Sequence, residues 1–538
     1  MAYTETAVKR KDGPEVHTEQ PKKSKIESRN EQKNTRKERK AHDRSFDMIT
    51  EAKKVWEQLR RGDIKREEQK ALMEKMMSII QGRVQDVIFK HDASRMIQTC
   101  LKKGNGEQRN QITEELKGKY ETLSKSMYGK FIVLKALEYC HWQRDSILSE
   151  FRTHVRKLIR HKEASSVIEG FYAQFSTAAQ RNELLAEFYG PEMTLFNRAG
   201  GSAKTLDALL EAMPEKKEPV LKYMADMLKG CLDKGTLVHS IVHKALLQYL
   251  TLADAKGRDE LMSLLRDSLQ EIIHTREGAR VAMLCLSYSS PKDKKAVIKA
   301  FKPFLSKMAV DEYGYLVLLR LLDVTDDTVL VSKAVVDELC KHAKELFADK
   351  FGRRFFLYIL TGRNTRYLSP ETVQQLVAGD EISTSKKDLK IKADELLAAS
   401  SPSLIKMVSN DAGVLMREKM SSQVVQEIML HAVGDKSAAI NAILALVNED
   451  IEKEDHVMEH RFANPVEPLN FAPQLLEVIR PNLGHFATSH GSFVVLALAE
   501  EPSTAKDVKK ELKAVKKDIK KAAEEKNAGA VKLVELLK

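Results

Sequence analysis

A short helical phrase returns along this chain at nearly constant intervals, and this regularity constrains the fold more than any other feature. Each copy joins a polar break, a small residue or glycine, and a helix with an aliphatic face, as in HDASRMIQTCL, SMYGKFIVLKAL, DEYGYLVLLRLL and DKFGRRFFLYIL. We call the residue after the small position the anchor. The nine anchors are Ser94, Lys130, Ser165, His239, Ala279, Tyr315, Arg353, Ser422 and Ser492.

The anchors lie 36, 35, 74, 40, 36, 38, 69 and 70 residues apart, so the longest intervals hold two periods of about 36. A repeat of this length with two helices is typical of an α-solenoid, in which each unit buries its apolar face against its neighbours. The sequence therefore predicts an all-α solenoid of helical repeats. It also predicts degenerate repeats near residues 202, 388 and 457, inside the double intervals.

The charge of the chain favours an anionic partner. There are 89 Lys and Arg against 77 Asp and Glu, a net charge of +12. Such an excess is typical of proteins that meet nucleic acid or an acidic membrane surface. No apolar run is long enough to cross a bilayer, and the first residues lack the apolar core of a signal peptide. We therefore expect a soluble protein inside the cell, with no membrane partner.

Both ends of the chain are basic. Residues 1–45 carry 13 Lys and Arg against 8 Asp and Glu, with clusters at 21–25 and 36–40, and we expect a disordered tail there. Such a tail is typical of a nuclear or nucleolar address or of an RNA-binding arm. The last segment, 501–538, is rich in lysine and predicts a solvated helix.

Four phrases relate the repeats to a known family. HDASRMIQTCLKKG, MYGKFIVLKALEYC, LVHSIVHKALLQYL and DKFGRRFFLYIL resemble the Pumilio repeats of the Puf-A-like (penguin) family, a divergent branch of Pumilio proteins. The resemblance covers roughly residues 46–500. It implies an N-terminal Pumilio-repeat array over 46–330, a C-terminal divergent array over 331–500, and two arms in an L-like arrangement.

The resemblance also implies a function. Members of this family reside in the nucleus and nucleolus, act in large-subunit ribosome assembly and pre-rRNA processing, and bind RNA or DNA with little sequence preference. The expected partners are therefore RNA and also DNA, and the proteins of pre-ribosomal particles. No small-molecule substrate is implied.

Pumilio repeats contact one base each through three positions of one helix. The anchor and the residue four places later read the base edge, and the residue after the anchor stacks on the base. Only the first repeat has all three, with Ser94 and Gln98 as edge readers and Arg95 as the stacking residue. The other repeats retain parts of the pattern, and their candidate contacts are Lys130, Phe131, Ser165, Glu169, His239, His243, Arg280, Arg353, Arg354, Ser422, Gln426 and Phe493.

One complete triplet cannot specify a long sequence, so affinity is expected to come from phosphate contacts and occasional stacking. The segment 154–162 concentrates four candidate cations, Arg156, Lys157, Arg160 and Lys162. Arg363 and Arg366 extend a second candidate patch beside Arg353 and Arg354. The alternative interpretation of such charge runs is a solvated helix face without a ligand.

Signals for an enzyme are weak. His456 and His460 enclose an HxxEH pattern, which in some metalloproteases holds zinc, but no third ligand is identifiable. The segment AGGSAKT at 199–205 lacks the spacing of a phosphate-binding loop. We therefore expect no catalytic residue, no metal and no cofactor.

Two other functions remain open from the sequence. A sequence-specific mRNA-binding translational regulator would use the repeats of Ser94, Ser165 and Ser422. A protein-scaffolding solenoid of the HEAT or armadillo kind would instead present its basic patches to acidic proteins.

Overall fold

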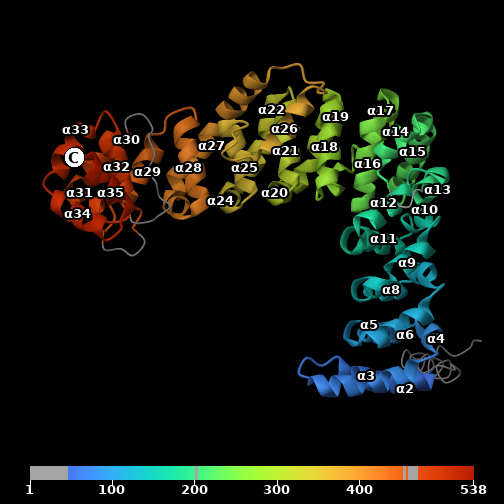
Figure 1. The fold of residues 1–538 in the computed structure, drawn as a ribbon. Helices are drawn as coiled ribbons and strands as arrows, with labels where there is room; N and C mark the ends of the chain where they lie inside the picture. Colours follow the sequence, from blue (N-terminus) through green and yellow to red (C-terminus); the bar gives the residue numbers. More distant parts are fainter. Residues whose placement is uncertain (1–45, 200–203, 452–455, 459–470, 538) are drawn as a thin grey trace, which may run out of the picture. The chain divides into compact units, whose positions relative to one another are not determined.

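The computed structural model describes residues 46–199, 204–451, 456–458 and 471–537. Helices and their connecting turns make up these residues, and no strand occurs among them (Figure 1). The predicted all-α repeat fold is thus confirmed. In the same residues, no helix is both long and apolar enough to cross a membrane.

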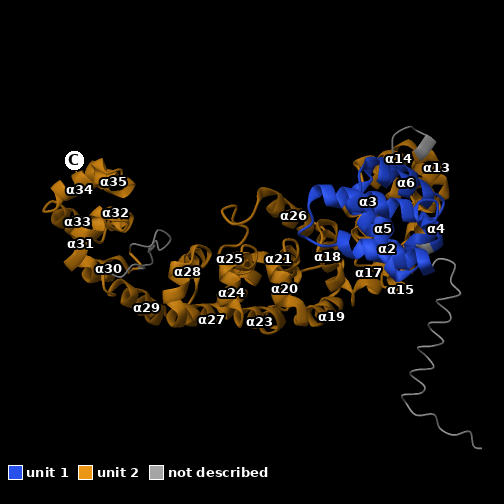
Figure 2. Cartoon of the chain, turned by 90° about the horizontal axis from the view of Figure 1, so that it is seen from below, with its two compact units in different colours: residues 1–147 blue, residues 148–538 orange. Residues whose placement is uncertain are grey.

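The chain divides into two compact units, residues 1–147 and 148–538 (Figure 2). The described helices of the first unit are α2 (Phe46–Leu59), α3 (Arg66–Ile80), α4 (Val84–Val87), α5 (His91–Lys103), α6 (Gly106–Leu116), α7 (Tyr120–Lys125), α8 (Gly129–Tyr139) and the short η1 (His141–Gln143). Helix α9 (Arg144–Phe151) spans the boundary. The predicted division into arrays at residues 330 and 500, and the arrangement of two arms, stay predictions.

The second unit begins with two groups of helices that lead into its long repeat array. The first group is α10 (Val155–Leu158), α11 (Ala164–Gly170), η2 (Phe171–Phe175), α12 (Ala178–Ala186), α13 (Pro191–Ala199) and α14 (Leu206–Ala212). The second is η3 (Pro214–Lys216), α15 (Lys217–Asp233), α16 (Ser240–Leu252), α17 (Ala255–Leu265), η4 (Leu269–Glu271) and α18 (Arg276–Tyr288).

The described helices of the array continue to residue 451 and again from residue 471. Its helices are α19 (Pro291–Phe301), η5 (Lys302–Phe304), α20 (Leu305–Val310), α21 (Gly314–Val324), α22 (Thr328–Val331), η6 (Ser332–Val336), α23 (Asp337–Cys340), α24 (Ala343–Ala348), α25 (Gly352–Thr361), α26 (Pro370–Asp380), α27 (Leu389–Arg417), α28 (Lys419–His431) and α29 (Ser437–Val447). The last helices are α30 (Phe471–Ile479), η7 (Arg480–Asn482), α31 (Leu483–Thr488), α32 (Ser492–Glu500), α33 (Ala505–Leu512), α34 (Lys516–Glu524) and α35 (Ala528–Leu536).

Most anchor helices pack in a row within each unit, whereas α32 packs on α31, α33 and α35. In the first unit α2, α5 and α8 pack side by side. In the second unit α16, α18, α21, α25 and α28 pack in the order of the sequence, while helices such as α19, α20 and α23 form the layer beside them (Figure 2). Neighbouring repeats therefore bury their apolar faces against one another, as a solenoid requires.

The glycine before the anchor has a packing reason. A Cβ atom at Gly129, Gly314 or Gly352 would lie 2.8, 2.7 or 2.9 Å from the carbonyl oxygen of the residue six positions earlier. The short helix that precedes each anchor helix ends against this glycine, so a side chain would push the two apart. The recurring glycine of the repeat phrase is thus needed for the tight turn between these two helices.

The lysine-rich end differs from the single helix expected for 501–538. It forms three short helices, α33, α34 and α35, which pack on α31 and α32. Their buried residues include Val508, Ile519 and Leu533, so each helix has its own apolar face. The tail 1–45 lies outside the described residues, as do residues 200–203 and most of the segment around 457. The part of the degenerate repeat expected near residue 202 that is described contains helix α14.

Candidate nucleic-acid interface

The first two repeats bring five of the predicted residues together. An open cavity of about 390 Å³ lies between α5 and α8. Its lining residues are His91, Ser94, Arg95, Gln98, Met127, Tyr128, Lys130 and Phe131. The predicted contacts of the first repeat and those of the second thus face a common hollow. His91, Met127 and Tyr128 were not predicted from the sequence, although they flank the predicted positions.

Ser94 serves the contact between these two repeats. Its side chain is fully buried, and its hydroxyl donates a 2.8 Å hydrogen bond to the carbonyl oxygen of Tyr128. The amide nitrogen of Gln98 donates to the same hydroxyl at 3.1 Å. The predicted edge reader therefore already holds α5 to the start of α8, and Gln98 is the more accessible of the pair.

Arg95 and Phe131 offer surfaces for stacking. The guanidinium of Arg95 lies 5.3 Å from the centre of the Trp56 ring, whose Nε1 donates to Thr99 at 2.8 Å. The ring of Phe131 is 45% exposed, and the Nζ of Lys130 lies 5.0 Å from its centre. An exposed aromatic ring beside a cation can stack on a base while the cation approaches a phosphate.

The four cations of the segment 154–162 separate into two pairs. Arg156 lies over the ring of Tyr223 at 5.0 Å, and Arg160 packs so closely on Gly230 that a Cβ there would be 2.6 Å from its Nη1. Both arginines thus pack on α15. Lys157 and Lys162 are exposed and remain accessible to a ligand.

The histidines of the α16 repeat hold helices together. His243 is fully buried, and its Nε2 donates to the carbonyl of Leu237 while its Nδ1 accepts from Thr275 at 2.7 Å. Burial lowers the pKa of His243 to about 3, and the nearby His274 adds to this shift. The pKa of His239 is also lowered, chiefly by burial. Glu169 accepts from the backbone nitrogen of Ile241 at 3.3 Å, at the start of α16.

The predicted contacts further along also pack against the protein. Arg354 donates to the Tyr315 hydroxyl at 2.6 Å and lies over the Tyr315 and Phe351 rings, while Arg353 donates to Gln423. The remaining positions have mixed exposure: Ser165 and Ser422 are buried, Gln426 is half-buried, and Arg280 and Phe493 are exposed. These placements leave the assignment of each residue to a ligand as a prediction.

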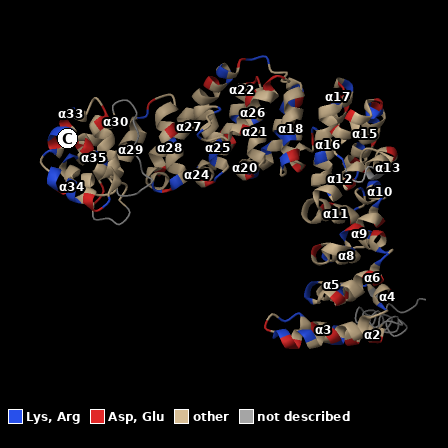
Figure 3. Cartoon of the chain, in the orientation of Figure 1, with Lys and Arg blue, Asp and Glu red and all other residues tan. Residues whose placement is uncertain are grey.

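Two of the four arginines in the second candidate patch are paired with acids. Arg363 pairs with Asp323 at 2.7 Å and with Asp380 at 2.6 Å, and Arg366 lies 3.6 Å from Glu427. Figure 3 shows Lys and Arg interspersed with Asp and Glu along many of the helices. Charge alone therefore does not mark one continuous track in the part of the chain that the structure describes.

The histidine motif does not assemble a metal site in the described residues. His456 is fully buried, stacks on Phe486 at 5.7 Å between ring centres, and accepts from the Met458 backbone nitrogen at 3.2 Å. Glu459 and His460 lie outside the described residues. No group of three or more His, Cys, Asp or Glu side chains suited to a metal occurs among the residues described.

Comparisons with known proteins agree with the repeats. Residues 93–117 match the Pumilio-family RNA binding repeat, and residues 348–466 match the CPL (NUC119) domain. Pumilio homology domain family member 6 of Schizosaccharomyces pombe is 34% identical over 533 residues, 94% of this chain and 83% of that protein. Human Pumilio homolog 3 is 36% identical over 423 residues, 77% of this chain and 65% of the human protein.

Solved structures agree as well. The crystal structure of human Puf-A matches with a TM-score of 0.83 at 33% identity, over 91% of this chain and 100% of that chain. Human Puf-A in complex with DNA matches with a TM-score of 0.82 at 33% identity, over 91% and 99%. The expectation that this chain is not an enzyme agrees with these Pumilio-repeat relatives. The chain therefore belongs to the Puf-A family of Pumilio-repeat proteins, which the sequence phrases had indicated.

Proposed function

We propose that this protein binds RNA, and also DNA, with little sequence preference, and that it acts in nucleolar assembly of the large ribosomal subunit and in pre-rRNA processing. The observation that carries the proposal is how the edge-reading positions are used. The side chains of Ser94, His243 and Ser422 form hydrogen bonds to other groups of the protein, at helix starts and between repeats. Phe131, Lys157 and Lys162 remain exposed. Stacking on base faces and contacts to phosphates do not distinguish one nucleotide sequence from another, so binding through them has little sequence preference.

The relatives support a nucleic-acid partner. A repeat model described as RNA binding matches residues 93–117, which hold most of α5 and all of α6, and a similar structure holds human Puf-A in complex with DNA. The net charge of +12 supports the same partner, because long-range attraction concentrates polyanions near a cationic protein.

The test is a comparison of unrelated oligonucleotides. Fluorescence anisotropy with the full chain should give affinities that differ from one another by no more than a few-fold among single-stranded RNAs of different sequence and DNA. The affinity should fall steeply as salt is added. In a plot of the logarithm of the binding constant against the logarithm of the salt concentration, each phosphate contact should add roughly 0.7–0.9 to the magnitude of the slope. A strong preference for one motif over its scrambled version would favour a sequence-specific mRNA regulator instead. Binding to acidic proteins with no measurable binding to nucleic acid would favour a scaffold.

The nucleolar role needs a separate test. We propose that the basic tail 1–45 contributes to nuclear and nucleolar targeting, because its lysine and arginine clusters are typical of such signals. Imaging of the tagged full chain and of a variant without this tail checks the location. Purification of the tagged protein should recover pre-rRNA and proteins of pre-ribosomal particles. Recovery of mature mRNAs alone would contradict the proposal.

A further inference from the structure

A second hollow lies within the second unit. Its volume is about 460 Å³, within the range of roughly 300–1,000 Å³ that small-ligand sites occupy. Helices α16 and α18 form one side, and α26 forms the other. Figure 2 shows α26 on the side of α18 and α21 that faces away from α19 and α20. The hollow therefore lies on the face of the anchor helices that the outer layer leaves uncovered.

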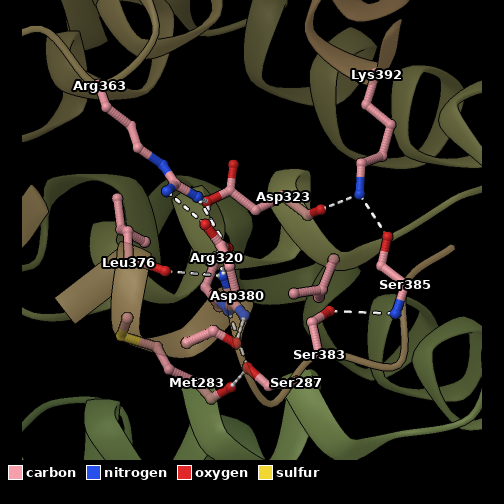
Figure 4. A network of polar contacts seen from close by, with 12 residues as sticks. Met283, Ser287, Arg320, Asp323, Arg363, Leu376, Asp380, Ser383, Ser385 and Lys392 are labelled. Atoms are coloured by element: carbon pink, nitrogen blue, oxygen red, sulfur yellow. Dashed lines mark hydrogen bonds and ion pairs between the residues drawn. The ribbon is translucent and has the colours of Figure 1, made fainter. Parts of the chain in front are cut away.

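A buried polar network fixes α26 in this position (Figure 4). Arg320 of α21 is fully buried, and its Nη1 donates to the carbonyl of Leu376 at 3.2 Å and pairs with Asp380 at 2.6 Å. Its Nε donates to the hydroxyl of Ser287 in α18 at 2.9 Å. One guanidinium thus joins α18, α21 and α26, so both walls of the hollow are held at a defined separation.

Gly379 brings α26 close to this guanidinium. A Cβ atom at this position would lie 2.8 Å from the central carbon of Arg320. The carbonyl of Gly379 also accepts from Arg320. A larger residue would push α26 outward and widen the hollow.

The lining of the hollow combines apolar side chains, a cationic side chain and an amide, which together suit a flat, polar ligand. Leu247, Met283 and Leu284 supply apolar surface. Arg280, the stacking position of its repeat, is exposed at the edge, and Gln374 of α26 is exposed on the opposite wall. A guanidinium plane can stack on a base, and a glutamine amide offers one donor and one acceptor group to a base edge.

The negative charge at the rim is balanced. Glu371 pairs with Arg276 of α18, so its carboxylate is not left to repel an incoming phosphate. The amide nitrogen of Gln375 also donates to this carboxylate, at 3.3 Å. The ion pair adds a second link between the walls of the hollow.

The α18 repeat by itself lacks edge readers, since its anchor is Ala279 and the residue four places later is Met283. The structure supplies an amide from α26, about 95 positions further along the chain from Ala279. We propose that this hollow binds one nucleobase of a single-stranded RNA or DNA, with Arg280 stacking on the base and Gln374 bonding to its edge. The inference rests on the proposed nucleic-acid binding and adds a specific contact site to it.

Photocrosslinking tests the site in the full chain. Single-stranded RNA containing 4-thiouridine is bound, irradiated and digested, and the crosslinked peptides are identified by mass spectrometry. We expect crosslinks in the segments 276–288 and 370–382. The double variant Arg280→Ala with Gln374→Ala should lower the crosslink yield there about fivefold or more, the factor that the lower end of base-stacking energies implies. Crosslinks near Phe131 should be unchanged.

The control variant is Gln474→Ala, which removes an exposed glutamine of α30 outside the hollow and should change neither yield. Crosslinks elsewhere but none in the two segments would overturn the site and leave the proposed nucleic-acid binding intact. An unchanged yield in the double variant would also overturn the site. The absence of any binding to RNA and DNA would overturn the proposed function together with the site.

Discussion

The hydroxyl of Ser94 donates a 2.8 Å hydrogen bond to the carbonyl oxygen of Tyr128, which joins one repeat to the next. Ser94 occupies the position from which a Pumilio repeat reads a base edge. Its burial means that the one complete triplet of the sequence has a structural bond in place of a free hydroxyl. Stacking residues and exposed lysines are therefore better candidates for ligand contacts than the anchors.

We expect Ser94→Ala to loosen the contact between α5 and α8. The carbonyl of Tyr128 loses the hydroxyl of Ser94 and keeps only the 3.4 Å hydrogen bond from the backbone nitrogen of Phe131, and the loss of one hydrogen bond costs about 0.5–1.5 kcal/mol. Hydrogen exchange of the α5 and α8 amides should quicken accordingly. RNA affinity should change less than in Gln98→Ala, since Gln98 is only half-buried. A large loss of affinity with unchanged exchange would show that Ser94 contacts the ligand.

Phe131→Ala should weaken binding to single-stranded RNA. The exposed ring gives a stacking surface, and the loss of one stacked base costs about 1–3 kcal/mol. Phe131→Tyr keeps the ring and should retain most of the affinity. Anisotropy titrations of the two variants at one salt concentration measure the difference, and equal losses would contradict a stacking role.

Substitutions of the four cations in the segment 154–162 should have different effects, because the two lysines are exposed and the two arginines pack on α15. Lys157→Ala and Lys162→Ala should each lower the log–log salt slope by roughly 0.7–0.9 if each lysine contacts one phosphate. Arg156→Ala should instead lower the thermal midpoint, because it removes the contact with the Tyr223 ring. Salt titrations and thermal unfolding of these three variants check both effects. A lower midpoint for the lysine variants with unchanged salt slopes would contradict the division.

Acid should destabilise the packing of α16 on α18 through His243. Its folded pKa of about 3 lies below the ordinary value of 6.5, so the unfolded chain binds a proton first as pH falls. The stability is present above pH ~6.5 and is lost progressively below it, by about 2 kcal/mol between pH 7 and pH 5. His274 and His239 lie nearby and add to the lowering of the pKa of His243.

Hydrogen exchange of the α16 and α18 amides, followed from pH 7 to pH 5 and corrected for intrinsic rates, measures this loss. His243→Gln removes the titrating group and should flatten the dependence. An equally steep dependence in this variant would assign the effect to another group.

Two arginines that bind α26 should differ sharply in importance. Arg320→Met removes the buried donor to the carbonyls of Leu376 and Gly379 and leaves Arg363 as the partner of Asp380, and breaking such a buried pair costs up to about 3–5 kcal/mol. Arg276→Met removes an ion pair whose side chains are 57% and 62% exposed, and exposed pairs contribute roughly 0–1 kcal/mol. Exchange of the α26 amides should rise strongly in the first variant and little in the second. Equal rises would contradict the role of burial.

The sequence indicated where the anchor helices lie but not what their side chains do. A glycine recurs before several anchors in the sequence. The structure explains it, because a carbonyl oxygen lies too close to Gly129, Gly314 and Gly352 for a Cβ atom to fit without displacement. The histidine pair of the α16 repeat looked like a base-reading pair. In the fold Thr275 and the Leu237 carbonyl satisfy both nitrogens of His243, and Thr275 belongs to the next repeat.

The amino-acid sequence by itself determined the solenoid, because each repeat carries its own apolar face and its own turn, and these local patterns recur at one period. Only the tertiary structure decided which polar groups form hydrogen bonds or ion pairs within the protein. Arg320 and Asp380 are 60 positions apart, and no periodicity relates them. Whether a side chain remains available to a ligand depends on burial and on partners from other helices, and both arise only when the repeats pack together.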